Sequence, residues 1–120
     1  FVWQKIYAWA ARDEEYVRRA AFAMIAGLAW HDKTAADERF IATFPLMEAA
    51  ATDERNFVKK AVNWALRNVG KRNPRLNVAA IAAARDIQRL DSRAARWIAA
   101  DALRELQSDA VQARLSNARS

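Results

Sequence analysis

VKKAVNWALRNVGKR, residues 58–72, has the hydrophobic period of an α-helix and decides the fold class of this chain. At about 100° per residue, one stripe of this helix is aliphatic: Val58, Val62, Ala65 and Val69. The opposite stripe holds one indole among three cations: Lys60, Trp64, Arg67 and Lys71. The segment is therefore predicted to pack through its first stripe and to turn its second stripe outward.

Composition extends the helical prediction to the whole chain. Among 120 residues, only two are glycine and two are proline, while 53% are hydrophobic. Few turn formers and abundant alanine favour long helices over short strands, and this length suits one domain. We therefore expect an all-α protein.

Caps and breaks divide the chain into six predicted helices. They cover residues 2–11, Asp13 (as cap) to Trp30, 36–51, Asp53 (as cap) to Gly70, Asn73–Pro74 to Leu90, and Asp91 or Ser92 to Leu106. Pro45 must either kink the third helix or open its second half. The second helix is predicted to have the core stripe Val17, Ala21, Met24 and Leu28.

The predicted helices also resemble one another at a regular spacing. Val17 aligns with Val58, and WALR of residues 64–67 aligns with DALR of residues 101–104, which gives steps of 41 and 37 residues. A helix-pair period near 40 residues is typical of HEAT-type repeats. Residues 1–108 are therefore predicted to form a HEAT-like repeat solenoid (an α-α superhelix) of three antiparallel helix pairs. The second helix of each pair would line a concave surface.

Residues 109–120 are more polar than the rest of the chain. We expect a polar tail that either frays or forms a short helix with a weak turn around Val111 and Leu115.

Positive charge is concentrated in one part of the sequence. Twenty Lys and Arg residues against fourteen Asp and Glu give a net charge of +6. No acid interrupts residues 55–85, which carry eight cations: Arg55, Lys59, Lys60, Arg67, Lys71, Arg72, Arg75 and Arg85. Such a local field favours a polyanionic partner.

Several classes of protein are excluded or disfavoured. The chain has no cysteine, so it offers no disulfide, thiolate metal site or cysteine nucleophile. No apolar run approaches the roughly 20 residues of a membrane span, and we expect a cytoplasmic protein with no membrane partner. No Ser-His-Asp set, glycine-rich phosphate loop or catalytic carboxylate pair can be assembled, and the lone His31 is given no role. We expect no cofactor and no metal ion.

The indole of Trp64 is the first candidate for binding. An exposed indole flanked by cations can stack on a sugar or base while the cations hold phosphates, whereas the alternative is an indole packed against a neighbouring repeat. Arg19 has a comparable position in the second helix, above a face of small residues. Trp97, Asp101 and Arg104 repeat the stripe in the sixth helix. There the acid either pairs with Arg104 or with a cation of the neighbouring repeat.

Two motifs and their order resemble a known family. YVRRAAF at 16–22 and FVKKAVNWALR at 57–67, followed by RWIAADALREL at 96–106, are similar to the DNA alkylation repair family, the AlkD-like HEAT-repeat DNA glycosylases. The resemblance implies a basic groove that binds double-stranded, alkylated DNA. It also implies that the intact protein excises cationic alkylated purines by hydrolysis of the N-glycosidic bond. Arg19 would hold the DNA near the lesion, and Trp64 would pack against the lesioned nucleotide.

The same resemblance predicts that the catalytic residue lies elsewhere. The family's catalytic aspartate belongs to a helix upstream of the region that FVWQKIYAWAA, residues 1–11, resembles. We therefore expect this chain to match the C-terminal part of the family fold, to carry no catalytic residue and to perform no independent base excision.

The sequence thus predicts a DNA-binding fragment of an alkylation repair protein, with its oligomeric state left open. Its predicted DNA-binding residues are Arg19, Lys59, Lys60, Trp64, Arg67, Lys71 and Arg72. If about four phosphates are neutralised, log affinity should fall with log salt at a slope of roughly −4. The alternative is a non-enzymatic helical-repeat scaffold that binds nucleic acid or an acidic protein through its basic concave face.

Overall fold

The computed structural model describes residues 1–119, and the side chains of residues 1–117. This part of the chain contains eight helices and no strand, which confirms the all-α prediction. The helices are α1 (Val2–Ala10), α2 (Glu15–His31), α3 (Asp37–Ile41), α4 (Phe44–Ala50), α5 (Asn56–Gly70), α6 (Pro74–Gln88), α7 (Arg93–Leu106) and α8 (Asp109–Arg119). None of the eight combines the length and apolarity needed to cross a bilayer.

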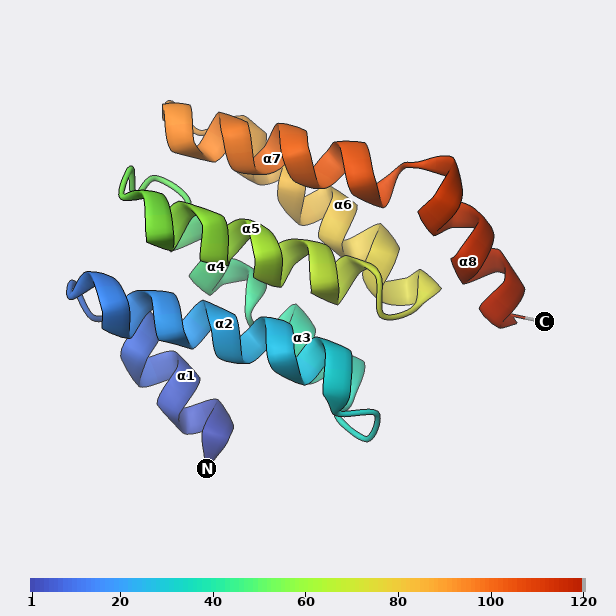
Figure 1. The fold of residues 1–120 in the computed structure, drawn as a ribbon, viewed down its shortest axis with the longest axis horizontal. Coiled ribbons are helices and arrows are strands. Elements are labelled where there is room, and N and C mark those ends of the chain that lie inside the picture. Colours follow the sequence, from blue (N-terminus) through green and yellow to red (C-terminus); the bar gives the residue numbers. More distant parts are fainter. Residues whose placement is uncertain (120) are drawn as a thin grey trace.

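The helices form two layers. The molecule measures 43 × 33 × 18 Å, and its shortest dimension is close to twice the width of a helix with its side chains. Figure 1 shows α2, α5 and α7 side by side in the front layer, all running in the same direction. α5 packs between α2 and α7, while α1 packs on α2, α4 and α6 pack on α5, and α6 packs on α7. The front face is therefore built by three parallel helices held on a second layer.

Two of the predicted caps are confirmed. Asn73 Oδ1 accepts the backbone N–H of Leu76 at 2.8 Å, and Pro74 occupies the first turn of α6. Ser92 Oγ accepts the backbone N–H of Ala95 at 3.2 Å at the start of α7. Ser92, not Asp91, is therefore the cap of the last predicted helix.

The other two predicted caps, Asp13 and Asp53, are wrong. The residues at the cap positions are Glu14 and Arg55, and neither makes a side-chain capping bond. Asp53 lies two residues before that position, and its Oδ1 accepts the backbone N–H of Arg55 at 3.0 Å. Its second oxygen bonds the guanidinium groups of Arg18 and Arg55, at 2.9 and 2.7 Å. Nearby guanidinium groups thus engage the carboxylate that the sequence analysis assigned to a cap.

The predicted helix over residues 36–51 is two helices in the structure. The chain leaves the helical path at Ala42–Thr43, and Pro45 lies in the first turn of α4. Proline fits there because a first-turn N–H has no partner within its helix. Buried Thr43 closes the break by donating its hydroxyl to Phe40 O at 2.6 Å. Of the two alternatives for Pro45, the structure has the one in which it opens a second helix.

The core stripe is confirmed in α5 and must be corrected in α2. All four residues of the aliphatic stripe of α5 are fully buried, and so are Ala95, Ile98, Ala102 and Leu106 of α7. In α2 the predicted Ala21 is buried and Met24 and Leu28 are partly buried against the core, but Phe22, Ile25, Ala26 and Ala29 are buried as well. Because α2 packs on both α1 and α5, its buried face is wider than the one predicted stripe.

The two glycines, Gly70 and Gly27, differ in how much space surrounds them, and this difference predicts opposite effects of alanine on stability. A Cβ at Gly70 would lie 2.5 Å from Leu106 Cδ2 and 2.9 Å from Ala80 Cβ, whereas one at Gly27 meets nothing within 4 Å. Gly70→Ala is expected to lower the free energy of unfolding by about 1 kcal/mol, because overpacking exceeds the gain in helix propensity. Gly27→Ala should raise it by about 0.5 kcal/mol. Urea unfolding followed by circular dichroism tests both, and a stabilised Gly70→Ala variant would contradict this packing.

The segment predicted as a tail contains α8. Val111 and Leu115 are buried, and α8 packs against α6 and α7. Gln112 Nε2 donates to Leu106 O at 2.7 Å and to Asn77 Oδ1 at 3.2 Å. Asn77 in turn donates to Gly70 O and Leu106 O, so one buried amide joins the ends of α5 and α7.

Candidate nucleic-acid interface

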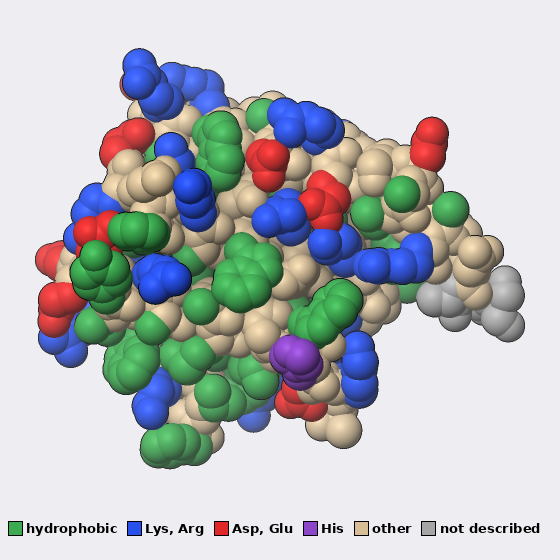
Figure 2. All heavy atoms as spheres, in the orientation of Figure 1, with side chains coloured by type: hydrophobic (Ala, Val, Ile, Leu, Met, Phe, Trp, Pro, Cys, Tyr) green, Lys and Arg blue, Asp and Glu red, His purple; other side chains and the backbone are tan. Residues whose placement is uncertain are grey.

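An open groove of about 890 Å³ crosses the front layer. Helices α2, α5 and α7 all contribute to its walls, with Ser108 just beyond α7. Figure 2 shows this face with Lys, Arg and a few Asp and Glu side chains over α5 and α7, around hydrophobic groups at its centre. The lining residues are Arg19, Ala23, Phe57, Lys60, Ala61, Asn63, Trp64, Arg67, Trp97, Asp101, Arg104, Glu105 and Ser108.

Trp64 lies in this groove as the outer stripe of α5 predicts. Its side chain is 46% exposed, so the alternative of a ring sealed between helices is excluded. Lys60 and Arg67, one turn to either side, line the same groove. The structure therefore brings an accessible indole and two of its predicted cations together on one surface.

Arg19 reaches the groove from α2 and lies over an aromatic ring. Its guanidinium carbon is 5.6 Å from the centroid of Phe57, and the ring of Tyr16 lies 6.0 Å from that of Phe57. A guanidinium over a ring face is restrained, while its N–H groups still point around the rim of the plane. The guanidinium of Arg19 is thus held against Phe57 at the wall of the groove.

Lys59 lies over the ring of Trp97, which belongs to the α7 side of the groove. Its ammonium nitrogen is 5.1 Å from the ring centroid of Trp97, which is exposed and lines the groove from α7. The contact spans α5 and α7 and keeps the ammonium group near the groove. Lys59 itself does not line the groove.

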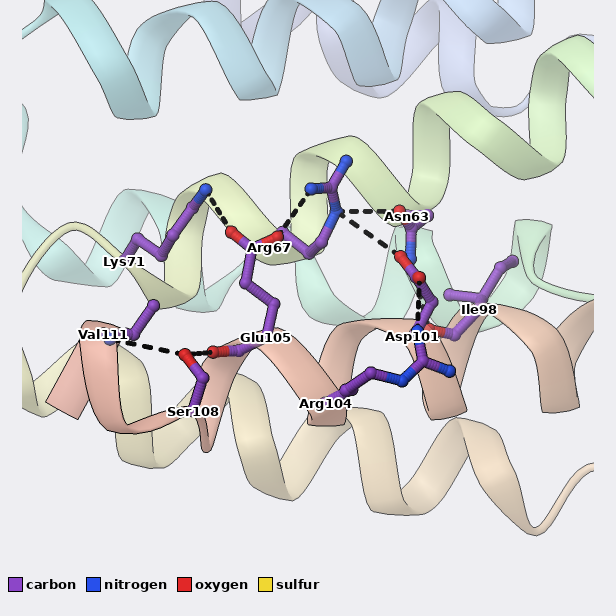
Figure 3. Close-up of polar contacts among 9 residues, drawn as sticks. All are labelled: Asn63, Arg67, Lys71, Ile98, Asp101, Arg104, Glu105, Ser108 and Val111. Carbon is purple, nitrogen blue, oxygen red and sulfur yellow. Dashed lines mark hydrogen bonds and ion pairs between the residues drawn. The ribbon is translucent and has the colours of Figure 1, made fainter.

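Arg67 and Lys71 are held by carboxylates of α7. Arg67 Nη1 lies 2.7 Å from Glu105 Oε1, Arg67 Nε lies 3.8 Å from Asp101 Oδ2, and Lys71 Nζ contacts Glu105 Oε2. Figure 3 shows both cations of α5 pointing toward these acids. Burial raises the pKa of Glu105, but the hydrogen bonds from Lys71 and Arg67 outweigh it, and the net pKa is lowered. Glu105 is therefore ionised at neutral pH, and its single negative charge engages two of the predicted DNA-binding side chains.

Asn63 fixes this cluster to the backbone. It is buried, its amide nitrogen donates to Ile98 O at 3.3 Å, and its Oδ1 accepts Arg67 Nε at 2.8 Å. Asp101 also pairs with Arg104, at 3.1 Å, so both pairings considered from the sequence occur at once. The Arg67 side chain consequently has a defined orientation between α5 and α7.

Arg72 lies away from the groove, in contrast to the position that the sequence analysis gave it. Its guanidinium donates to Ala29 O at 3.1 Å and to Ala35 O at 2.8 Å, and lies 4.6 Å from the ring centroid of Phe40. These contacts bind the end of α5 to the end of α2. Arg72 is a brace between helices because it comes one residue after Lys71, the last residue of the stripe, and so lies off that stripe.

Three cations near the groove have no acidic partner. Among residues 1–117, no carboxylate forms an ion pair with Arg19, Lys59 or Lys60. Sequence reasoning gave no role to Phe57, Asn63 and Glu105. Phe57 lies seven residues before Trp64, so helical spacing could have placed it on the same stripe. Glu105 lies four residues after Asp101, and the same rule would have placed it beside that acid.

Comparison with known proteins gives one match. A family model described as DNA alkylation repair enzyme matches residues 2–113. The comparisons with curated proteins and with solved structures gave no significant match. The matched range includes every residue that lines the groove.

Proposed function

The chain belongs to the DNA alkylation repair enzyme family, and on this premise we propose that its groove binds double-stranded DNA. The observation that carries the proposal is the exposed indole of Trp64, placed between α2 and α7 in a groove that also receives Arg19 and Lys60. Guanidinium and ammonium groups contact phosphates, while an accessible indole offers a flat apolar face to a sugar or base.

We extend the proposal to the architecture. The front helices α2, α5 and α7 are the second members of three antiparallel pairs in a HEAT-like solenoid, and residues 1–108 form that repeat domain. Two features support this arrangement: the sequence steps of 41 and 37 residues, and the single groove to which all three helices contribute. In such an array the inner helices form a continuous binding face.

Within this groove each residue has a distinct proposed role. Arg19, Lys59 and Lys60 contact phosphates, and Trp64 packs against the lesioned nucleotide. A cationic alkylated purine suits that position, because the face of an indole attracts positive charge. In the intact protein this contact would accompany hydrolysis of the N-glycosidic bond, for which we assign no catalytic residue within this chain.

The salt dependence of binding tests this proposal. Glu105 engages Arg67 and Lys71, and Arg72 lies away from the groove, so three of the six predicted cations remain available. We therefore expect log affinity for a duplex to fall with log salt at a slope of roughly −3. Fluorescence anisotropy of a labelled duplex at several salt concentrations gives this slope. Lys60→Gln should reduce its magnitude by about one, whereas Arg89→Gln, at an exposed pair elsewhere, should not change it.

Two outcomes would contradict the proposal. The first is an affinity for duplex DNA that does not change with salt. The second is an equal effect of Lys60→Gln and Arg89→Gln, which would mean that the general charge of the chain, not the groove, attracts DNA. Binding of an acidic protein in place of DNA would favour the scaffold alternative.

A further inference from the structure

Arg114 of α8 holds a positive charge at the end of α5. Its Nη2 donates to Lys71 O at 3.0 Å, and its side chain is exposed. Among residues 1–117, no carboxylate forms an ion pair with Arg114. A carbonyl oxygen accepts one N–H but does not compensate the charge, and a guanidinium group has five N–H donors. Arg114 can therefore bind an anion while it keeps its contact with α5.

The packing of α8 fixes the place of this arginine. Val111 and Leu115, which precede and follow Arg114 in the helix, are buried. Gln112 Nε2 donates to Leu106 O at 2.7 Å and so joins α8 to the end of α7. Figure 1 shows α8 turning from the end of α7 toward the end of α5. The guanidinium group is consequently presented beside the front layer by a docked helix.

The three cations near the groove that lack an acidic partner within residues 1–117 form a row across the front layer. We call Arg19, Lys59 and Lys60 the first row. Arg19 belongs to α2 and Lys60 to α5, while Lys59 lies over Trp97 of α7. A strand of nucleic acid that follows the first row therefore runs across the helices, not along them.

Arg114 lies well away from the first row along α5. Lys71, whose carbonyl oxygen it contacts, comes eleven residues after Lys60, and a helical rise of 1.5 Å per residue makes this about 16 Å. Figure 2 shows Lys and Arg side chains over the end of α5, on the same face as the groove. Trp64 lies between these two positions on α5. Positive charge thus borders the indole on both sides.

Duplex DNA has two phosphate backbones, which border grooves of roughly 12 Å and 6 Å width. A separation of about 16 Å is comparable with the wider groove once the phosphate groups at its borders are included. When one strand follows the first row, the other strand can therefore approach the end of α5. A single strand has no second backbone to place there.

We propose that Arg114 contacts a phosphate of the second strand of a duplex whose other strand is held by the first row. The inference rests on the proposed function for the presence of duplex DNA in the groove. It adds α8 to the interface and makes that interface selective for double-stranded DNA. The contact should steepen the slope of log affinity against log salt by about one beyond that of the first row alone.

Three arginine variants test the contact. Arg114→Gln removes the charge, and Arg114→Lys keeps it, because an ammonium group also binds phosphate. Arg85→Gln is the matched control, since Arg85 is exposed on α6 and has no ion pair within residues 1–117. All three variants should fold, because both arginines are exposed, and thermal unfolding followed by circular dichroism checks this.

Fluorescence anisotropy of a labelled duplex at several salt concentrations measures the effect on the slope. Arg114→Gln should reduce its magnitude by about one, whereas Arg114→Lys and Arg85→Gln should leave it unchanged. A merely structural role of Arg114 would not give this pattern. An unchanged slope in Arg114→Gln would overturn the proposal, and so would an equal reduction in Arg85→Gln.

The same titrations with one strand of that duplex show which backbone Arg114 contacts. Lys60→Gln should weaken the binding of both duplex and single strand, whereas Arg114→Gln should weaken the binding of duplex alone. Equal effects of Arg114→Gln on the two forms would overturn the second-strand contact. If Lys60→Gln alters duplex binding and Arg114→Gln does not, the contact of α8 fails and the groove stands. If only Arg114→Gln alters it, the proposed function of the groove fails and the contact of α8 stands.

Discussion

Asp53→Ala is expected to lower the free energy of unfolding by about 3 kcal/mol, because it leaves the guanidinium of Arg18 without its main partner. The Asp53 side chain is only 7% exposed and that of Arg18 is 18% exposed. Their atoms lie 2.9 Å apart, and the second partner of Arg18, Asp13, is fully exposed and more distant, at 3.3 Å. Removal of one member of a shielded pair is costly because the remaining charge stays away from water.

An exposed pair supplies the matched control. Asp86 bonds Arg89 at 2.8 Å, but both side chains are more than half exposed, and Asp86→Ala should change stability by less than about 0.5 kcal/mol. Urea unfolding followed by circular dichroism measures both variants under identical conditions. If the two variants lose similar free energies of unfolding, Asp53 contributes no more to stability than an exposed carboxylate does.

The dependence of stability on acid pH tests the role of Asp53 in a second way. Hydrogen bonds from Arg55, followed by those of its backbone N–H and of Arg18, lower the pKa of Asp53 from 3.8 to about 2 despite its burial. A carboxyl group with a depressed folded-state pKa contributes stability that is present above pH 3.8 and lost as the pH falls toward 2. The wild-type chain should therefore lose about 2 kcal/mol more than Asp53→Ala over this interval. Parallel pH profiles of the two proteins would be inconsistent with that pKa.

The role of Asp53 also illustrates where sequence reasoning succeeds and fails. The stripe of α5 was predictable because helical period alone decides which residues face the second layer. Asp53 was mistaken for a cap because its carboxylate is shared between Arg55, two residues on, and Arg18, which is 35 residues away in the sequence. Local rules describe a residue's own helix, whereas an ion pair between helices depends on how those helices pack.

In the candidate site, too, features set within one helix were predictable and contacts between helices were not. The outward direction of Trp64 followed from its angle on α5, and the structure confirms it. Arg72 has the same charge and nearly the same place in the sequence as Lys71, yet it leaves the helical stripe and braces α2. The acids that engage Arg67 lie on α7, and nothing within residues 55–85 could indicate them. A run of positive charge thus overstates the number of cations that a ligand can use.

Glu105→Gln is therefore expected to raise the affinity for duplex DNA several-fold at low salt, because it frees Lys71 from its carboxylate and leaves Arg67 with Asp101 alone among its acidic partners. With Lys71 added to the three available cations, the slope of log affinity against log salt should steepen from roughly −3 to roughly −4.

Glu38→Gln is the charge-matched control for this variant. Glu38 pairs with Arg75 outside the groove, and both side chains are more than half exposed. Its replacement adds the same single positive charge to the chain and should leave the slope unchanged, because long-range attraction between exposed groups is screened by salt. Anisotropy titrations of the two variants at matched salt concentrations distinguish local release from general charge. If Glu105→Gln and Glu38→Gln strengthen binding equally, the ion pairs across α5 and α7 do not limit how tightly the groove holds DNA.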